Sequence, residues 1–505
     1  MSTVRAAGIT ALKRALMAGT PVIAVSSWEE DQVLSTLTAV SHSVFQSDKP
    51  LTQWDLQTGI TCGEPALPGA STPEAALEAA ARATEPGFFV FRDVIPFLGR
   101  PDVQRRLRSV AAAFRGQNRF LFLLGGDIQL PIDIRKEVYL LDFGLPDQAE
   151  LAELIQRAIA TAVRKGAENN TTPDDLSAAA TALQGFTSIE AQQSLTKLLW
   201  GAKTIDSSII RQLQEEKEQL ARKEGLLEYV RTEFSLDDVG GLENLKTWLV
   251  KRRRLFSPEA AAAGLRPPRG LLMMGISGCG KSLSVKAISA LWNLPLFRLD
   301  MNQVYSGLHG SPEGAFHRAI HSVEAMAPAI LWFDEIEGGI SSSTMKDGST
   351  GSHIFSAFLT WMQEKKADVF VAATANRIDL LPAEIIRKGR FDQVFFIDLP
   401  NDREREDIFK VHLTRRGVDT ANFDLTLLSV STEFWNGAEI EHVVEAALVE
   451  AFDRGEKLTL DDLYTIIRST VPLSRTMAEQ IKFIRAWASE RAVSASLPEK
   501  QQQGR

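Results

Sequence analysis

Short apolar runs alternate with amphipathic stretches through the second half of the chain. The apolar runs are residues 270–275, 294–300, 329–333, 368–375 and 393–399, and helix-period patterns fill 281–292, 312–326 and 351–366. Short buried strands separated by helices predict a parallel sheet that is covered on both faces. From about Asp402 onward the pattern is helical only, so we expect a small helical lid to follow the sheet.

The first half of the chain repeats this plan. GFFVFRDV (87–94) stands where AILWFDEI (329–336) stands later, and EVYLLDFGLPD (137–147) resembles QVFFIDLPN (393–401). The interval from Pro146 to Gly185 nearly equals that from Pro400 to Gly437. We interpret these matches as an internal duplication, although unrelated α/β modules can share such patterns.

These patterns divide the chain into five parts. The predicted parts are an α/β domain with its own helical lid at 1–205, a charged helical connector at 206–233, a larger α/β domain at 234–400, its helical lid at 401–475, and a C-terminal helix and tail at 476–505.

Composition adds modest constraints on function. The 505 residues carry a net charge of −8, which argues against a large nucleic-acid surface; the basic run 251–254 is the exception and is more simply a solvated helix face. Two cysteines, Cys62 and Cys279, give no disulfide framework or zinc site, as expected for a reducing cytosol. The longest apolar stretches are too short for a membrane span. We therefore expect a cytoplasmic protein.

One glycine-rich segment carries the strongest chemical signal. Residues 275–282, GISGCGKS, fit the phosphate-binding pattern G-x-x-x-x-G-K-[ST] between a strand and a helix. Glycines let successive backbone N–H groups wrap a phosphate, and the helix beginning at Lys281 adds its positive dipole end. Lys281 would reach the β- and γ-phosphates of ATP, and the Ser282 hydroxyl would bind Mg²⁺. The loop residues expected to bind nucleotide are Gly275, Ile276, Ser277, Gly278, Cys279, Gly280, Lys281, Ser282 and Leu283.

Acidic, amide and basic residues follow the later strands. Asp334 and Glu335 end the apolar run ILWF, so Asp334 can hold the Mg²⁺ shell and Glu335 can polarise an attacking water. Asn376 ends the next run, where its amide can orient that water or contact the γ-phosphate. Arg387 and Arg390 come too late to serve their own site easily, which suits arginine fingers that reach a neighbouring subunit; a surface role is the alternative.

Together these residues resemble the AAA+ ATPases of the cell-division-cycle and proteasomal type. The motifs DDVGGL, DEIE, ATANR, RKGRFD and NGAEIE match that group in order and spacing between about Phe234 and Gly455. The resemblance implies a P-loop AAA+ module with a parallel sheet and a helical lid, preceded by a degenerate AAA-like α/β module. It further implies that Val239, Gly240 and Gly241 pass against the adenine and that Gly437 and Ala438 contact the nucleotide.

The whole chain resembles a narrower family, encoded in cyanobacteria and in some algal plastid genomes as a hypothetical chloroplast reading frame. FFVFRDVIPFL, VYLLDFGLPD and the tail VPLSRTMAEQIKFIRAWASERAVSAS carry this resemblance. It implies a cytosolic ATPase, or a stromal one if plastid-encoded, and it does not identify a substrate.

Three departures from the broad pattern matter. Ile276 and Ser277 stand where prolines are usual, and Cys279 stands where threonine is usual; Cys279 is either a small buried filler or a thiol whose pKa is lowered by Lys281 and the helix terminus. The pore-loop position reads Leu308-His309 and lacks the usual aromatic residue, which puts substrate threading in doubt. In the first half the glycine loop is missing and Arg92 replaces the Mg²⁺ carboxylate, so we predict that this half does not hydrolyse ATP.

Three functions fit these observations. The first is an ATP-driven homo-oligomer, a hexameric ring, that remodels a protein partner. The second is a slow ATP-dependent switch or scaffold that binds partners through the inactive first half. The third, a nucleic-acid motor, is disfavoured by the acidic balance of the chain.

Overall fold

A computed structural model describes the chain at residues 4–47, 49–62, 71–126, 128, 130–209, 212–213, 215–217, 225–231, 234–256, 259–260, 263–306, 311–341, 350–387 and 389–497. The chain divides into two compact units, Met1–Leu213 and Gln214–Arg505, each of which is described by itself. The division falls inside the segment that we expected to be a connector. No helix in the described part of the chain has the length and apolar character needed to cross a membrane.

The second unit is built on a seven-stranded sheet in the order β15-β14-β10-β13-β12-β11-β9. Its strands are β9 (Leu227–Tyr229), β10 (Gly270–Gly275), β11 (Leu296–Leu299), β12 (Ala329–Phe333), β13 (Val369–Ala375), β14 (Gln393–Ile397) and β15 (Val493–Ser494). All neighbouring strands run parallel except β9 and β11. The carboxyl ends of the parallel strands therefore meet at one edge of the sheet.

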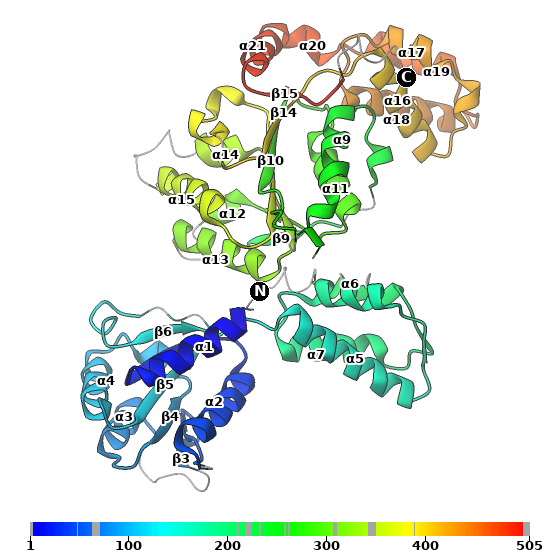
Figure 1. Ribbon diagram of the computed structural model, residues 1–505. Helices are drawn as coiled ribbons and strands as arrows, with labels where there is room; N and C mark the ends of the chain where they lie inside the picture. The colour runs from blue at the N-terminus through cyan, green and yellow to red at the C-terminus, as the bar shows by residue number, and fades with distance from the viewer. Residues whose placement is uncertain are drawn as a thin grey trace. The chain divides into compact units, whose positions relative to one another are not determined.

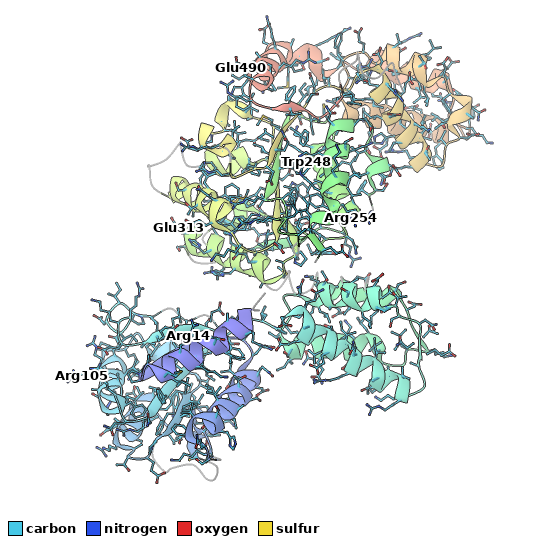
Figure 2. All side chains as sticks on the ribbon, viewed as in Figure 1. Arg14, Arg105, Trp248, Arg254, Glu313 and Glu490 are labelled. Atoms are coloured by element: carbon cyan, nitrogen blue, oxygen red, sulfur yellow. The ribbon has the colours of Figure 1, made fainter. Side chains whose placement is uncertain are left out.

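Helices cover both faces of this sheet (Figure 1). They are α9 (Glu243–Arg252) and α11 (Lys281–Trp292) on one face, and α12 (Met301–Tyr305), α13 (Pro312–Ala325), α14 (Ile336–Ser341) and α15 (Thr350–Glu364) on the other. The strand β10 shows why both faces need cover, because Leu271 and Met273 join one apolar core while Leu272 and Met274 join the other. Trp248, labelled in Figure 2, belongs to α9. It packs edge to face against Phe395 of β14.

The two edge strands differ from the sequence expectation. Residues 227–229 were expected to continue a helical connector, but they form β9, in which Leu227 is buried and Tyr229 packs against Phe297 of β11. Val493 and Ser494 were expected to lie in a C-terminal tail, but they pair with β14. Each strand is too short to give a periodic signal of its own, and each gains its hydrogen bonds from a neighbour distant in sequence.

A helical lid follows the sheet, as the pattern from Asp402 onward predicts. It contains α16 (Asp402–Arg415), α17 (Leu425–Ser431), α18 (Gly437–Asp453) and α19 (Leu460–Ser469), and α20 (Leu473–Thr476) and α21 (Ala478–Ser489) come after it. Capping boxes fix where three of these helices begin: Asn401 with Glu404 for α16, Asn436 with Glu439 for α18, and Thr459 with Asp462 for α19.

The first unit has a six-stranded sheet in the order β3-β2-β4-β5-β1-β6. Its strands are β1 (Val22–Ser26), β2 (Thr52–Asp55), β3 (Gly59–Cys62), β4 (Gly87–Phe91), β5 (Arg119–Gly125) and β6 (Tyr139–Asp142). Helices α1 (Val4–Met17) and α2 (Glu30–Phe45) cover one face, and α3 (Pro73–Arg82) and α4 (Pro101–Phe114) cover the other (Figure 1). The helices α5 (Gln148–Arg164), α6 (Pro173–Leu183) and α7 (Ser188–Leu199) follow this sheet.

The five central parallel strands have one order in both units. If these parallel strands are counted from one to five along each unit, their order across the sheet is 5-1-4-3-2 in both. In the second unit this order is β14-β10-β13-β12-β11, and in the first unit it is β6-β1-β5-β4-β2. The capping boxes also recur, since Asp147 with Glu150 begins α5 and Thr187 with Glu190 begins α7. A duplication of one α/β module would produce this shared topology.

Candidate nucleotide site

The glycine loop joins β10 to α11 at the carboxyl edge of the larger sheet. Gly275 has φ +145, and a Cβ added there would overlap the carbonyl oxygen of Ile397 on β14. Gly278 has φ +77, and a Cβ there would press on the side chain of Asn436 at the start of α18. Glycine is therefore required at both positions by conformation and by space. The loop backbone is held closely against both the sheet and the lid.

Lys281 begins α11 and is 6% exposed. Its ammonium donates hydrogen bonds to the carbonyl oxygens of Gly275, at 3.0 Å, and Ile276, at 2.6 Å. Burial lowers the pKa of Lys281 to about 8, although the charges of Glu337, Glu335 and Asp334 oppose that shift. The cation is thus held inside the loop by backbone dipoles and faces a cluster of carboxylates.

Hydroxyl groups connect the loop to the end of β12. The Ser282 hydroxyl lies 3.3 Å from Asp334 Oδ1 and donates to it, and Thr374 Oγ1 of β13 donates to the same oxygen at 2.7 Å. Thr374 Oγ1 also accepts from the backbone N–H of Glu335 at 3.0 Å. Sequence reasoning named the serine and both acids but missed Thr374, although it lies inside the ATAN motif.

Glu335 and Asn376 are in direct contact. The Asn376 amide donates to Glu335 Oε1 at 2.7 Å, and Glu335 adopts φ +47, which turns the chain sharply out of β12. Asn376 Oδ1 is buried and has no hydrogen-bond partner among the residues that the structure describes. The pair therefore presents one exposed carboxylate, held by the Asn376 amide, at this edge of the sheet.

Two further segments pack against α16 or against the glycine loop. A Cβ on Gly240 would overlap Ile408 of α16, and one on Gly241 would overlap Glu404, which accepts the N–H of Leu242 at 3.1 Å. Val239, just before them, is buried. On the other side, Ala438 N–H donates to Gly278 O at 2.9 Å, and Gly437 packs against the same carbonyl. Sequence reasoning missed Ile408 and Asn436, because their roles depend on how the lid folds back.

The remaining loop residues differ in their exposure to solvent. Ile276 is buried and its N–H donates to Ile397 O at 3.1 Å, Ser277 is exposed, and Leu283 packs against the apolar core below α11. Burial raises the pKa of Cys279 to about 12, and the charge of Lys281 only partly offsets that shift. Of the two interpretations of Cys279, the structure therefore favours the small buried filler over a thiol with a lowered pKa.

The two arginines predicted as arginine fingers, Arg387 and Arg390, lie in the segment between β13 and β14. Arg387 is exposed, and Arg390 donates to the carbonyl of Glu384 within its own turn. Neither is hydrogen-bonded to the glycine loop or to the acids in the described part of the chain. The expected pore-loop residues Leu308 and His309 lie outside the described residues.

The corresponding edge of the first unit is filled by the protein's own charges. Arg92, which follows β4, pairs with Asp55 and, at 3.1 Å, with Glu30 at the start of α2. Glu29 is 2% exposed; it pairs with Arg5 and accepts the N–H of Ser188 at the start of α7. No phosphate cradle is formed by these residues, since two carboxylates stand where the loop would need donors.

Comparison with known protein families finds three matches along the chain. Residues 9–143 match the model of the SpoVK-like AAA ATPase N-terminal domain, residues 149–224 match its second domain, and residues 271–399 match the AAA family, ATPases associated with various cellular activities. The sheet, the lid and these matches together define an AAA-type protein of the P-loop class.

Relatives along the full length give the narrower family. The chain is 34% identical over 481 residues to the "Uncharacterized AAA domain-containing protein ycf46" of Trieres chinensis, covering 94% of this chain and 95% of that protein. It is 35% identical over 485 residues to ycf46 of Pyropia yezoensis, with 94% and 97% covered. The chain therefore belongs to the ycf46 family of AAA domain-containing proteins, which confirms the resemblance drawn from the sequence. More distantly, it is 28% identical to the proteasome-activating nucleotidase of Thermococcus onnurineus over 265 residues, 50% of this chain and 65% of that protein.

Proposed function

We propose that the chain is a Mg²⁺-dependent ATPase with one active site per chain, in the second unit. The observation that carries this proposal is the convergence of Lys281, Ser282, Asp334, Glu335 and Asn376 at one sheet edge, connected by the bonds from Ser282 to Asp334 and from Asn376 to Glu335. These residue types bind phosphates, hold a divalent cation and activate water.

The donor set fits a magnesium nucleotide. A hydroxyl and a carboxylate 3.3 Å apart, Ser282 and Asp334, are the oxygen ligands that Mg²⁺ prefers, and the ion would neutralise charge on the phosphate oxygens when bound. The buried ammonium of Lys281 would exchange its two carbonyl partners for phosphate oxygens. Ile408, between Gly240 and Gly437, would give the base an apolar wall.

The pair at the end of β12 and β13 would handle the water. Glu335 is exposed at the edge of the sheet, so its carboxylate would take a proton from the attacking water. Asn376 would hold Glu335 through its amide nitrogen and so fix the direction in which the carboxylate faces that water. Hydrolysis then depends on both groups, whereas nucleotide binding depends on the glycine loop.

The variant Glu335→Gln tests this division of labour. It should bind ATP with unchanged affinity while kcat falls by about 10²-fold or more, because general-base assistance is lost. Asp93→Asn is the matched control, since Asp93 occupies the corresponding left-handed turn after β4 with φ +55. An unchanged kcat in Glu335→Gln, or an equal loss in Asp93→Asn, would contradict the proposal.

We further propose that the chain works as a homo-oligomer, a hexameric ring, that acts on a protein partner. Arg387 and Arg390 support this step, since neither engages its own site in the described residues and both would complete a neighbour's. Light scattering of Glu335→Gln should show a ring with ATP and smaller species with ADP. A monomer under both conditions, despite ATP binding, would reject the ring.

A slow switch or scaffold is the second candidate. It is favoured by the first unit, whose site is closed by Arg92 with Glu30 and Asp55, so that half of the chain is available only for packing or for partners. Turnover near background that no partner stimulates would support the switch. Binding of nucleic acid is disfavoured by the net charge of −8.

A further inference from the structure

Glu337 is a buried acid next to the proposed site that has no role so far. It lies two residues after Glu335, near the start of α14, and is 5% exposed. Its Oε1 accepts two backbone N–H groups, from Asn376 at 2.7 Å and from Arg377 at 3.0 Å. Its Oε2 is buried and has no partner among the described residues. Burying a carboxylate is costly, so its retention needs a reason.

The two N–H groups lie where β13 ends and the chain leaves the sheet. A strand neighbour cannot satisfy them there, so the direction of the backbone at Asn376 depends on the carboxylate that receives them. The direction of the backbone in turn sets where the Asn376 side chain points, and that side chain donates to Glu335 at 2.7 Å. Hydrogen bonds thus lead from Glu337 through the backbone of Asn376 to the Glu335 carboxylate.

The first unit supplies an internal comparison. Asp93 makes the same left-handed turn after β4, and the residue two places later is Ile95, which packs over the backbone of Gly125 at the end of β5. An apolar side chain therefore suffices to build this corner of the fold. The acid occurs in the unit that carries Lys281 and Glu335, and is replaced in the unit that lacks both.

We propose that Glu337 is a positioning residue that holds Asn376 in register with Glu335, an inference that rests on the proposed ATPase function. Glu337 acts through the backbone of Asn376 and touches no reacting atom. Removing its acceptor would let the amide drift from Glu335, while the glycine loop would bind ATP as before.

The test is a double-variant cycle on the full chain. Glu337→Ala and Glu337→Ile, the latter matching Ile95, should each lower kcat by about 10- to 100-fold with the KM for ATP unchanged within about threefold. Glu337→Gln retains an oxygen acceptor, so its kcat should stay within about fivefold of that of the parent chain.

The second arm of the cycle uses an Asn376→Ala background, in which Glu337→Ala should cause little further loss of kcat. Glu324→Ala, which removes the partner of the Trp361 indole at 2.8 Å, is the control for a lost, partly buried carboxylate acceptor elsewhere in the same unit.

A second readout is independent of turnover. In the nucleotide-free protein, amide hydrogen exchange at Asn376 and Arg377 should speed up in Glu337→Ala and Glu337→Ile but remain slow in Glu337→Gln. Equal kcat losses in the parent and Asn376→Ala backgrounds, or unchanged exchange at the two amides, would overturn the inference. If the parent chain itself fails to hydrolyse ATP, the proposed function falls, while the exchange experiment still decides whether Glu337 holds Asn376.

Discussion

The two units share one backbone plan but reverse its charges at the same corner. In the second unit α11 begins with Lys281 and β12 is followed by Asp334; in the first, α2 begins with Glu30 and β4 is followed by Arg92. The left-handed residue after each of these strands is retained, as Glu335 with φ +47 and Asp93 with φ +55. The comparison teaches that strand order and turn geometry persist without the chemistry that the edge of the sheet can carry.

The first unit replaces a ligand with internal ion pairs. Burial raises the pKa of Asp55, but hydrogen bonds from Thr58 and Gln57 and the charge of Arg92 outweigh that effect, so the pKa of Asp55 is lowered overall. A carboxylate of this kind stabilises the fold at neutral pH, and its contribution is lost as the pH falls through its depressed pKa. Glu29 ties α1 to the start of α7 in a similar way. The unit is therefore held closed by its own side chains.

The largest expected difference between the units concerns Lys281 and Glu30. Lys281→Ala should abolish ATP binding and lower ATPase activity by about 10³-fold or more, because the cation facing the β- and γ-phosphates is removed. Glu30→Gln, at the start of α2, should leave kcat within about twofold of the value for the parent chain. Fluorescent-nucleotide titration and phosphate release measure both effects. Equal losses in the two variants would break the comparison.

The next effect concerns the arginines before β14. Arg387→Ala and Arg390→Ala should each lower kcat by about 10²- to 10³-fold with ATP affinity retained, because an arginine acts on charge that develops in the transition state. Arg135→Ala is the matched control, since Arg135 precedes β6 within the similar sequence IRK. Mixing Glu335→Gln chains with Arg390→Ala chains should restore part of the activity if the arginine acts between subunits; a lack of rescue with normal assembly would reject that role.

Removal of Arg92 should affect only stability. The Arg92 side chain is 28% exposed and Asp55 is 12% exposed, so Arg92→Ala leaves a largely buried carboxylate without its cation. We expect the unfolding free energy of the first unit to fall by about 1–3 kcal/mol, with ATPase activity unchanged. Denaturant unfolding measures the change in unfolding free energy, and phosphate release measures the ATPase activity. A loss of turnover without a loss of stability would show that the first unit takes part in hydrolysis.

A smaller effect follows from the lowered pKa of Lys281, about 8 in the nucleotide-free protein. The protonated form binds phosphate, so ATP affinity should be constant below pH 8 and then weaken by up to about tenfold per pH unit. Burial of Lys281 also carries a penalty for folding of the nucleotide-free protein below pH 8, and this penalty is relieved as the pH rises from 8 toward the ordinary lysine pKa of 10.5. Lys281→Arg keeps its charge and should show a flat binding profile across this range.

Features encoded in contiguous sequence could be predicted from the chain alone. The alternation of strands and helices, the glycine loop, and the acids that end β12 each need only local pattern and residue type. The groups that complete the site depend on contacts between segments that are distant in sequence. Thr374 at the end of β13 donates to Asp334, which follows the neighbouring strand β12. Ile408 lies close to Gly240 and Gly437 only because the lid folds back. The sequence left two interpretations of Cys279 open, and burial, which outweighs the charge of Lys281, favours the small buried filler.

Nucleotide stoichiometry tests the central claim most directly. Isothermal titration of Glu335→Gln with ATP and Mg²⁺ should give one bound nucleotide per chain, and the double variant with Lys281→Ala should bind none. Two nucleotides per chain, or one that survives the loss of Lys281, would contradict the account by placing a working phosphate site in the first unit.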